Sequence, residues 1–335
     1  MITGSLAKPG IVIVNYNSLD YVVEAIASVQ SAKQLAGKTR IIVVDNASTT
    51  HTFENLHAAV QKSVDGSVAT ANQAGPRVCF TSGCSKTSEI AIIKAQRNDG
   101  FASGCNIGLR YLYETEVDFF LLLNPDTVID ENALQAFAVK LSGDTSYGLV
   151  GATLMNTQGK SVSQACSGAK LHGWSLLGKN LGAGLSKEAL PSEGEVEQSL
   201  SYPVGAAIAF RRDWLEHVGF MDERYFLYYE EADWCRAGAD RYRPGWAKNA
   251  VVYHHHGATA GSNLAAQKRS ALADYHMIRS RMLFALKWYR FNLPVILILT
   301  LIQSGRRFLR GQKEQARAVL QAGVPGAARK YIPHA

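Results

Sequence analysis

Two short runs of β-branched residues constrain the fold of this chain more than any other feature. Residues 11–14 and 41–44 are Ile or Val at every position, and polar residues follow each run at once. Strands that are apolar on both faces are typical of a parallel sheet with helices on both sides. The pattern of residues 20–30, between the two runs, predicts the helix that a parallel crossover requires. The sequence therefore indicates an α/β fold with a mostly parallel central sheet.

Further elements are predicted along the chain. Residues 119–123, 204–210 and 250–253 have the apolar composition of buried strands. Residues 222–236, which carry a cluster of acids, are predicted to be largely helical. Residues 62–96 are rich in Ser, Thr, Ala and Gly, so we predict an insertion or a long loop there.

Charge divides the chain into two parts. The 335 residues carry a net charge of +7. Residues 262–335 contain 13 Lys or Arg against two acids, a net charge of +11, whereas residues 1–261 contain 22 basic and 26 acidic residues, a net charge of −4. This distribution argues against nucleic acid as the partner of the whole protein and for a local anionic partner such as a membrane surface. We predict a main domain over 1–261, with the insertion at 62–96, and a basic amphipathic helical extension over 262–335.

The extension contains an apolar run, residues 294–302, that is too short to span a bilayer, which takes about 20 residues. Aromatic and basic residues flank the run, so it suits a segment that lies in the interface of an anionic membrane. A helix packed on the main domain or in a homodimer is the alternative. No secretory signal is visible at the N-terminus, and the five cysteines form no CxxC pair. We therefore expect a cytoplasmic protein that is peripheral on the inner face of the cell membrane.

Polar residues follow the first two predicted strands and form a candidate nucleoside site. The first cluster is Asn15-Tyr16-Asn17, and the second begins with Asp45-Asn46. An Asp carboxylate can accept a hydrogen bond from a pyrimidine imide N–H, and a Tyr ring can stack on the base. Turn formation alone would also explain these residues. Because ligands bind beyond the carboxyl ends of parallel strands, two such clusters together favour binding.

A glycine-rich segment at residues 98–108 is a candidate for diphosphate binding. It contains Gly100, Phe101, Gly104 and Asn106 and leads into a predicted helix. Glycine allows the backbone to approach a ligand closely, and a helix N-terminus favours phosphate. The segment is not GxGxxG, so a dinucleotide-binding fold is poorly supported. A plain loop is the alternative.

Carboxylate and imidazole side chains at strand ends form a candidate metal site. Asn124 and Asp126 follow the strand predicted at 119–123, and Asp126 is a ligand of the kind that Mg²⁺ or Mn²⁺ prefers. His254 and His256 would share one face of a strand, with His255 on the other, so at most two of the three histidines could bind one ion. A solvated turn is the alternative for the histidines.

Three acids of the predicted helix at 222–236 are candidates for general base catalysis. Glu230, Glu231 and Asp233 lie within one helical turn. Neighbouring carboxylates raise one another's pKa, and a raised pKa suits a general base. Many acidic pairs on helices are simply exposed to solvent.

Taken in order, these segments resemble the inverting glycosyltransferases of family 2, and most closely their rhamnosyltransferase-like branch. The resemblance covers roughly residues 11–261. The motifs that carry it are IVNYNS at 13–18, VVDNAS at 43–48, GFASGCN at 100–106, LNPDT at 123–127, GFMDERYFLYYEEAD at 219–233 and VYHHHG at 252–257.

The resemblance implies the GT-A fold and assigns roles to individual residues. Asp45 would hold the base, and Asp126 and His254 would hold a divalent metal, Mg²⁺ or Mn²⁺. Glu231 would be the catalytic base. The acidic motif reads Glu-Glu here, so Glu230 stays a candidate for that role.

The expected function is metal-assisted, inverting transfer of a sugar from a nucleotide-diphosphate donor. The resemblance favours L-rhamnose from dTDP-rhamnose, with a hydroxyl of a surface glycan or a lipid-linked glycan as acceptor. Transfer of another hexose is one alternative. A non-catalytic nucleotide-sugar-binding protein on the same fold is the other.

Overall fold

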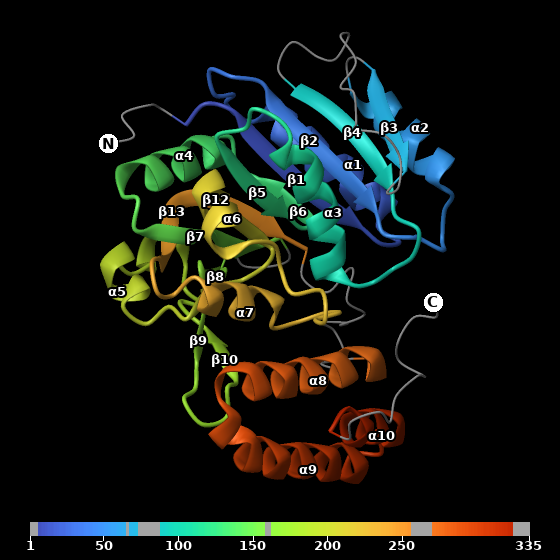
Figure 1. Ribbon diagram of the computed structural model, residues 1–335, viewed down its shortest axis with the longest axis vertical. Helices are drawn as coiled ribbons and strands as arrows, with labels where there is room; N and C mark the ends of the chain where they lie inside the picture. The colour runs from blue at the N-terminus through green and yellow to red at the C-terminus, as the bar shows by residue number, and fades with distance from the viewer. Residues whose placement is uncertain (1–5, 65–66, 73–87, 158–161, 256–269, 324–335) are drawn as a thin grey trace.

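The computed structural model describes residues 6–64, 67–72, 88–157, 162–255 and 270–323 (Figure 1). Within these ranges a ten-stranded sheet has the strand order β3-β4-β2-β1-β5-β12-β7-β13-β6, with β8 beside β7. Its strands are β1 Pro9–Asn15, β2 Thr39–Asp45, β3 Val68–Asn72, β4 Ser88–Lys94, β5 Phe119–Leu123, β6 Thr127–Ile129, β7 Tyr147–Asn156, β8 Ser163–Cys166, β12 Ala207–Arg211 and β13 Arg243–His254.

The part of the sheet from β3 to β5 is parallel, as the apolar runs predicted. Strand β1 pairs with β2 on one side and with β5 on the other, both in parallel. The strand order therefore reverses at β1, and the loops after β1, β2 and β5 leave the same edge of the sheet. Beyond β5 the sheet is mixed, because β12 is antiparallel to both β5 and β7.

Helices cover both faces of the sheet. Successive residues of a strand point to opposite sides, and in the central strands the side chains on both sides are apolar. Ile11 and Ile13 belong to one core with α1 Leu19–Ser31, α2 Phe53–Ser63 and α4 Ala133–Gly143. Val12 and Val14 belong to a second core with α3 Phe101–Tyr113, α6 Arg212–Val218 and α7 Glu230–Ala237. Every residue of β1 and of β5 is buried.

Two predictions about local structure need correction. The segment 62–96 is not one long loop, because β3 and β4 lie within it and β4 pairs with β2 in the interior of the sheet. Residues 65–66 and 73–87 of that segment lie outside the described residues. The helix predicted over 222–236 begins at Glu230, since Tyr228 and Tyr229 before it have left-handed backbone angles that cannot continue a helix. The boundary predicted at 261 also lies outside the described residues.

A second, small sheet and three helices complete the fold. The small sheet contains β9 Gly168–Leu171, β10 Gly178–Asn180 and β11 Tyr202–Pro203, and α5 Glu193–Glu197 lies between β10 and β11 in the chain. The helices are α8 Ala271–Trp288, α9 Leu293–Leu309 and α10 Lys313–Ala322. They form a separate layer next to α7, on the side away from the large sheet (Figure 1). None of the helices in the described ranges has the length and apolar character needed to cross a bilayer.

Helix α3 can lie close to β1 because glycines face the strand. A Cβ atom added at Gly108 would lie 2.5 Å from Cγ1 and 3.3 Å from Cβ of Val12, whose branched side chain cannot rotate away. We expect Gly108→Ala to lower the free energy of unfolding by about 1–3 kcal/mol, the usual cost of overpacking a core. Gly143→Ala, which meets nothing within 4 Å, is the matched control. Urea unfolding of both variants checks this, and equal stability of the two would contradict it.

Candidate functional site

The side chains that follow β1 and β2 form one hydrogen-bonded cluster. Asn15 accepts a bond at Oδ1 from the Ser18 N–H, at 3.1 Å, which turns its Nδ2 toward β2. That amide then donates to Asp45 Oδ1 at 3.0 Å and to Ser48 Oγ at 3.1 Å. Ser48 also donates to Asp45 Oδ1. Among the described residues these contacts all fall on Oδ1, so Oδ2 is the oxygen of Asp45 that can accept from a ligand.

The rest of the first polar segment caps this cluster. Asn17 has a left-handed backbone, and its Oδ1 accepts from the backbone N–H groups of Thr49 and Thr50 at 2.7 and 3.0 Å. Tyr16 is 36% exposed beside it, so its ring is available to stack on a planar ligand. The polar segments after β1 and β2 therefore form turns and also supply candidate ligand contacts.

Asn46 links this cluster to the N-terminus of α3. Its Nδ2 donates to Asn98 Oδ1 at 3.0 Å and to the Gly100 carbonyl at 3.1 Å. Gly100 has a φ of +98°, and a Cβ there would lie 2.3 Å from the Phe226 carbonyl oxygen. That carbonyl accepts from the Phe101 N–H at 2.8 Å. The glycine is therefore required by the close approach of residues 220–229, and the first N–H of α3 is already engaged with protein.

Two other residues of the glycine-rich segment face protein as well. A Cβ at Gly104 would lie 2.6 Å from Cγ1 of Val14, so this glycine lets α3 pack on β1. Asn106 is buried, accepts from the Met221 N–H at 3.0 Å, and donates to the Met221 carbonyl and to Glu223, each at 2.9 Å. These contacts hold the loop that leads to α7. A direct contact of either residue with a nucleotide sugar stays a prediction.

The candidate metal ligands Asp126 and His254 meet across the sheet. Asp126 follows β5, is 1% exposed, and its Oδ1 lies 3.4 Å from Nε2 of His254 at the end of β13. The neighbouring Asn124 donates its backbone N–H to the Ala206 carbonyl at 3.0 Å, which fixes the turn that carries Asp126. His255 points to the opposite side, toward Tyr21 and Glu24. The alternation predicted from the sequence is thus present, while His256 lies outside the described residues.

Gln164 of β8 orients the His254 ring. Its Nε2 donates to the His254 carbonyl at 2.8 Å, which turns its Oε1 toward His254 Nδ1, also at 2.8 Å. An oxygen acceptor at that distance requires the proton on Nδ1. In the neutral ring, the lone pair of Nε2 therefore faces the Asp126 carboxylate, and a cation or a second ring proton is needed between them.

This geometry fits a divalent ion held by two protein ligands. Ligands on adjacent positions of an octahedral ion, with bonds of about 2.1 Å, lie about 3 Å apart, close to the observed 3.4 Å. Across the residues that the structure describes, no group of three or more His, Cys, Asp or Glu side chains could hold a metal. Two protein ligands are enough for Mg²⁺ or Mn²⁺, because such ions complete their coordination shell with phosphate oxygens and water.

The two glutamates at the start of α7 differ in their environment. Glu230 is 3% exposed, and burial raises the pKa of its carboxyl well above the usual range, with the neighbouring Glu231 raising it further. Glu231 is half-buried, and its Oε1 accepts from the Gly205 N–H at 2.9 Å. Burial also raises the pKa of Glu231, while that N–H and its own backbone N–H oppose the effect. Of these two glutamates, only Glu231 combines a raised pKa with partial exposure to solvent.

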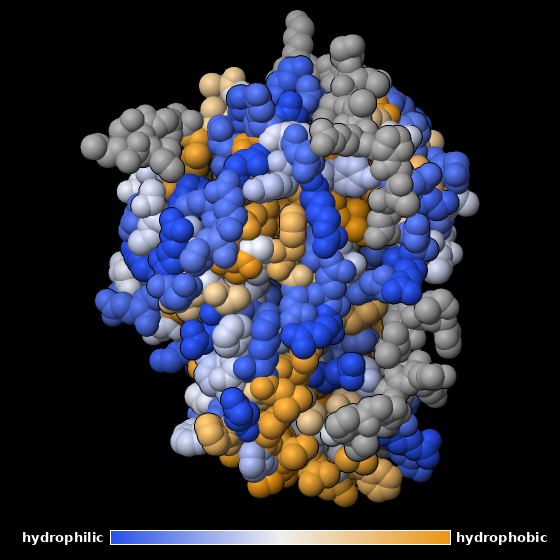
Figure 2. Space-filling view, viewed as in Figure 1, coloured by the Kyte–Doolittle hydropathy of each residue, from blue (hydrophilic) through white to orange (hydrophobic). Residues whose placement is uncertain are grey.

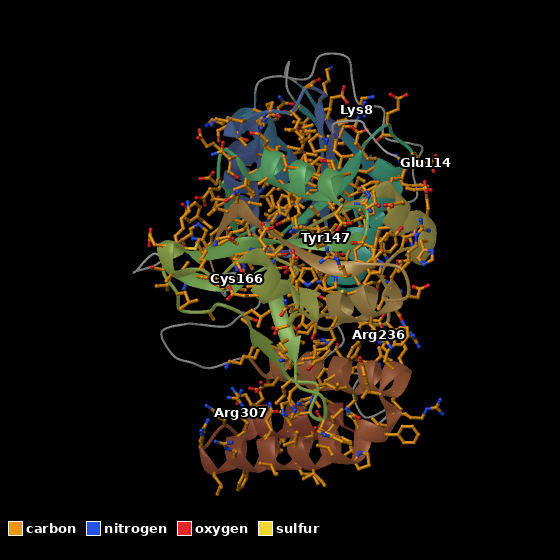
Figure 3. The ribbon with its side chains drawn as sticks, turned by 90° about the vertical axis from the view of Figure 1, so that its left-hand side faces the viewer. Lys8, Glu114, Tyr147, Cys166, Arg236 and Arg307 are labelled. Atoms are coloured by element: carbon orange, nitrogen blue, oxygen red, sulfur yellow. The ribbon has the colours of Figure 1, made fainter. Side chains whose placement is uncertain are left out.

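The third acid of the cluster is engaged elsewhere. Asp233 is buried and accepts from Lys287 Nζ at 2.7 Å, from Trp288 Nε1 at 2.7 Å and from the Tyr225 hydroxyl at 3.1 Å. Lys287 and Trp288 belong to α8, and the Arg236 guanidinium lies over the Trp288 ring at 5.5 Å, where α7 meets the C-terminal helices (Figure 3). Asp233 thus joins α7 to α8, which leaves Glu230 and Glu231 as candidate bases.

Sequence reasoning did not find three residues that shape this site. His51 is largely buried, with Nε2 3.0 Å from Asn15 Nδ2 and 4.0 Å from Asp45 Oδ1. Gln164 orients His254, and Gly205 leaves the space that the Glu231 carboxylate fills, because a Cβ there would lie 2.5 Å from Oε1. Of these three residues, only Gly205 carried a local signal in the sequence, because a glycine near the start of the strand predicted at 204–210 indicates close approach of another group.

Short backbone links bring the candidate metal ligands and the candidate base to one edge of the sheet. Residue 124 bonds to Ala206, and the adjacent Gly205 bonds to Glu231. The Asp45 cluster reaches the same α7 through Asn46, Gly100 and the loop around Phe226. One edge therefore combines a candidate acceptor for a base N–H, a candidate pair of metal ligands and a carboxylate of raised pKa.

Comparisons with known proteins identify the family and the fold that this chain resembles. The family model described as glycosyl transferase family 2 matches residues 10–219. The low-salt glycan biosynthesis hexosyltransferase Agl10 of Haloferax volcanii is 26% identical over 151 residues, 44% of this chain and 45% of that protein. The dTDP-rhamnosyl transferase RfbF of Shigella flexneri is 22% identical over 147 residues, again 44% and 45%. The match therefore spans less than half of either relative.

Two solved structures resemble this one over most of its length. The mannosyltransferase PcManGT from Pyrobaculum calidifontis, in complex with GDP-Man and Mn²⁺, has a TM-score of 0.53 at 14% identity and covers 95% of this chain and 75% of its own. S. aureus TarS 1–349 in complex with UDP-GlcNAc also has a TM-score of 0.53 at 14% identity, covering 96% and 82%. At this identity the likeness shows a shared fold.

Proposed function

Because this chain belongs to glycosyl transferase family 2 and has the GT-A fold of its structural neighbours, we propose that it transfers a sugar from a nucleotide-diphosphate donor to an acceptor hydroxyl. The observation that carries the proposal is the assembly of Asp45, the Asp126–His254 pair and Glu231 along one edge of the sheet. Each of these groups suits a different part of such a donor–acceptor pair.

The proposed reaction is a single inverting displacement. The carboxylate of Glu231 takes the proton of the acceptor hydroxyl as that oxygen attacks the anomeric carbon of the sugar. The bond from this carbon to the diphosphate oxygen breaks, and its electron pair leaves with the nucleoside diphosphate. A divalent ion held by Asp126 and His254 would stabilise the charge on that leaving group. Attack from the face opposite the diphosphate inverts the anomeric centre.

For the donor we propose dTDP-rhamnose. The support is the similarity to the dTDP-rhamnosyl transferase RfbF over 147 residues. The acceptor we propose is a hydroxyl of a surface glycan or of a lipid-linked glycan, a choice that the similarity to a glycan biosynthesis hexosyltransferase favours. Thermal-shift measurements with dTDP-rhamnose, UDP-GlcNAc and GDP-mannose, each with Mn²⁺, test the donor. Stabilisation by one of the other two nucleotide sugars alone would replace rhamnose with another hexose.

A non-catalytic nucleotide-sugar-binding protein is the second candidate, and release of nucleotide separates the two. The transferase proposal expects slow, Mn²⁺-dependent hydrolysis of the bound donor when no acceptor is present, because water can take the acceptor's place. Tight donor binding with no turnover, with or without a panel of glycan acceptors, would favour the binding protein.

The role of Asp45 gives a sharp test of nucleoside binding. In Asp45→Asn the oxygen can keep its bonds from Asn15 and Ser48, which turns the new NH₂ group toward the ligand. The NH₂ group, a hydrogen-bond donor, would then face the imide N–H of the base, which is also a donor. We expect donor affinity to fall about 10- to 100-fold, as loss of a charged hydrogen bond implies, with little change in kcat. Asp20→Asn, on the exposed side of α1, is the matched control. Unchanged affinity measured by calorimetry would remove Asp45 from the site.

A further inference from the structure

Helix α9 exposes more large apolar side chains than it buries. Its inner face, against α8 and α10, consists of Ile296, Thr300 and Ser304, all buried. Thr300 donates to the Ile296 carbonyl, and Ser304 donates to the Ala316 carbonyl of α10. Two of the three buried side chains on the packed side are thus small and polar, although the helix as a whole is strongly apolar.

The outer face of α9 presents large apolar side chains to solvent. Leu297, Leu301 and Leu309 lie on one row of i, i+4 spacing, and Ile298 and Ile302 lie on the adjacent row. Phe308 is seven residues after Leu301 and therefore on the same side, so these side chains form one continuous surface. Leu301 is 62% exposed and Leu309 is 86% exposed. Figure 2 shows the apolar surface at the end of the molecule that α8 and α9 form. We call this surface the α9 face; its exposed members are Leu297, Ile298, Leu301, Ile302, Phe308 and Leu309.

Basic side chains continue the α9 face at its C-terminal end. Arg306 and Arg310 follow Ile298 and Ile302 at intervals of four, so they extend the same row, and both are exposed. In the described ranges neither arginine forms an ion pair. From residue 290 to residue 317 the sequence has six Lys or Arg and one acid, Glu314. Figure 3 places Arg307 in the same layer, where it pairs with Asp274 at 2.9 Å.

We propose that the α9 face docks on an anionic lipid surface, with α9 lying parallel to the membrane plane. Only one side of α9 can meet lipid, because its other side is packed on α8 and α10. Apolar side chains would enter the boundary between headgroups and acyl chains, and Arg306 and Arg310 would meet lipid phosphates. The charge favours this partner over a second copy of the chain, since a second copy carries the same net positive charge around α9 whereas an anionic lipid surface carries the opposite charge. The proposal does not depend on the transferase activity.

Co-sedimentation of the full chain with vesicles tests the proposal. We expect binding to vesicles of phosphatidylglycerol and phosphatidylcholine at low salt, weaker binding at 0.5 M salt, and little binding to phosphatidylcholine alone. The double variant Leu301→Glu/Ile302→Glu replaces two exposed residues and should lower vesicle affinity at least tenfold. Val139→Glu, at an exposed apolar residue of α4, is the matched control and should bind as the unaltered protein does.

The arginines are tested separately from the apolar residues. An arginine near an anionic surface contributes roughly a fivefold gain in affinity, so Arg306→Gln/Arg310→Gln should lower affinity about 25-fold and reduce the dependence on salt. Lys62→Gln, at an exposed lysine of α2, should change neither.

Three outcomes would overturn the proposal. The first is absence of vesicle binding by the full chain at low salt. The second is equal binding by the α9 variants and their controls. The third is a dimer, seen by sedimentation velocity, that ignores vesicles and separates into monomers in Leu301→Glu/Ile302→Glu. That last result would assign the α9 face to a second copy of the chain.

Discussion

Glu231→Gln is expected to lower turnover roughly 10²- to 10⁴-fold, the range lost when a positioned general base is removed. The substitution keeps the size and polarity of the side chain, and the amide oxygen can still accept from the Gly205 N–H. Donor affinity should therefore change little, so the loss should appear in kcat. Initial rates at saturating donor, together with donor affinity by calorimetry, check this. Glu216→Gln, at an exposed position of α6, is the matched control.

The pH dependence of the same reaction provides a second measure. A base works only when deprotonated, and burial raises the pKa of Glu231 above that of an ordinary glutamate. The rate should thus fall on the acid side at a pH above the usual glutamate range and rise through that pKa as pH increases. Because Glu230 and Glu231 lie side by side, the acid limb reports the pair. If the acid limb of the pH–rate profile disappears in Glu231→Gln, the limb reports the ionisation of the catalytic base.

Glu230→Gln tests whether Glu230 is the catalytic base or only a buried neighbour of Glu231. The folded-state pKa of Glu230 is raised, so folded protein holds a proton that unfolded protein has released at the same pH. Stability is then greatest below the unfolded pKa and falls as pH rises toward the folded pKa. Glu230→Gln should remove this loss and be more stable than the unaltered protein at neutral pH. If Glu230→Gln abolishes turnover while Glu231→Gln stays active, the two roles are exchanged.

The site residues at the edge of the sheet could be predicted from the sequence because each of them follows a recognisable strand. Asn15, Asp45 and Asp126 each follow an apolar strand, and the ends of parallel strands meet at one edge. Strand alternation likewise placed His254 and His255 on opposite sides, and only His254 reaches Asp126. These predictions needed the period of a strand and the direction of the sheet, and no long-range contact.

The residues that were missed depend on contacts that leave no local signal. Gln164 reaches His254 because β8 folds back on β7, which is parallel to β13. The loop before α7 is not helical because α8 packs on it, with His276 stacked on Phe226 and Ser280 bonded to the Leu227 carbonyl. Strand β4 did carry a signal, the apolar run at residues 90–93. The polar composition of its surroundings hid that run.

Asp126→Asn is expected to lower kcat/KM roughly 10²- to 10³-fold, because an ion that stabilises a departing diphosphate is worth several kcal/mol. The carboxamide keeps the shape of the carboxylate but lacks its charge, and Mg²⁺ and Mn²⁺ bind through few, charged oxygen ligands. Chelation of the unaltered protein should cause a comparable loss that added Mn²⁺ reverses. Asp130→Asn, four residues further on, is the matched control.

Binding measurements distinguish loss of metal from loss of fold. Titration of Mn²⁺ in the presence of nucleoside diphosphate, followed by electron paramagnetic resonance, should show a bound ion in the unaltered protein and a much weaker one in Asp126→Asn. Free nucleoside should bind both equally, since Asp45 and Tyr16 lie in a separate cluster. Gln164 orients the histidine ligand and does not itself bind the ion. Gln164→Ala should therefore weaken Mn²⁺ binding about 10- to 100-fold. Full activity after exhaustive chelation would exclude the metal, and the contact between Asp126 and His254 would then be a structural ion pair.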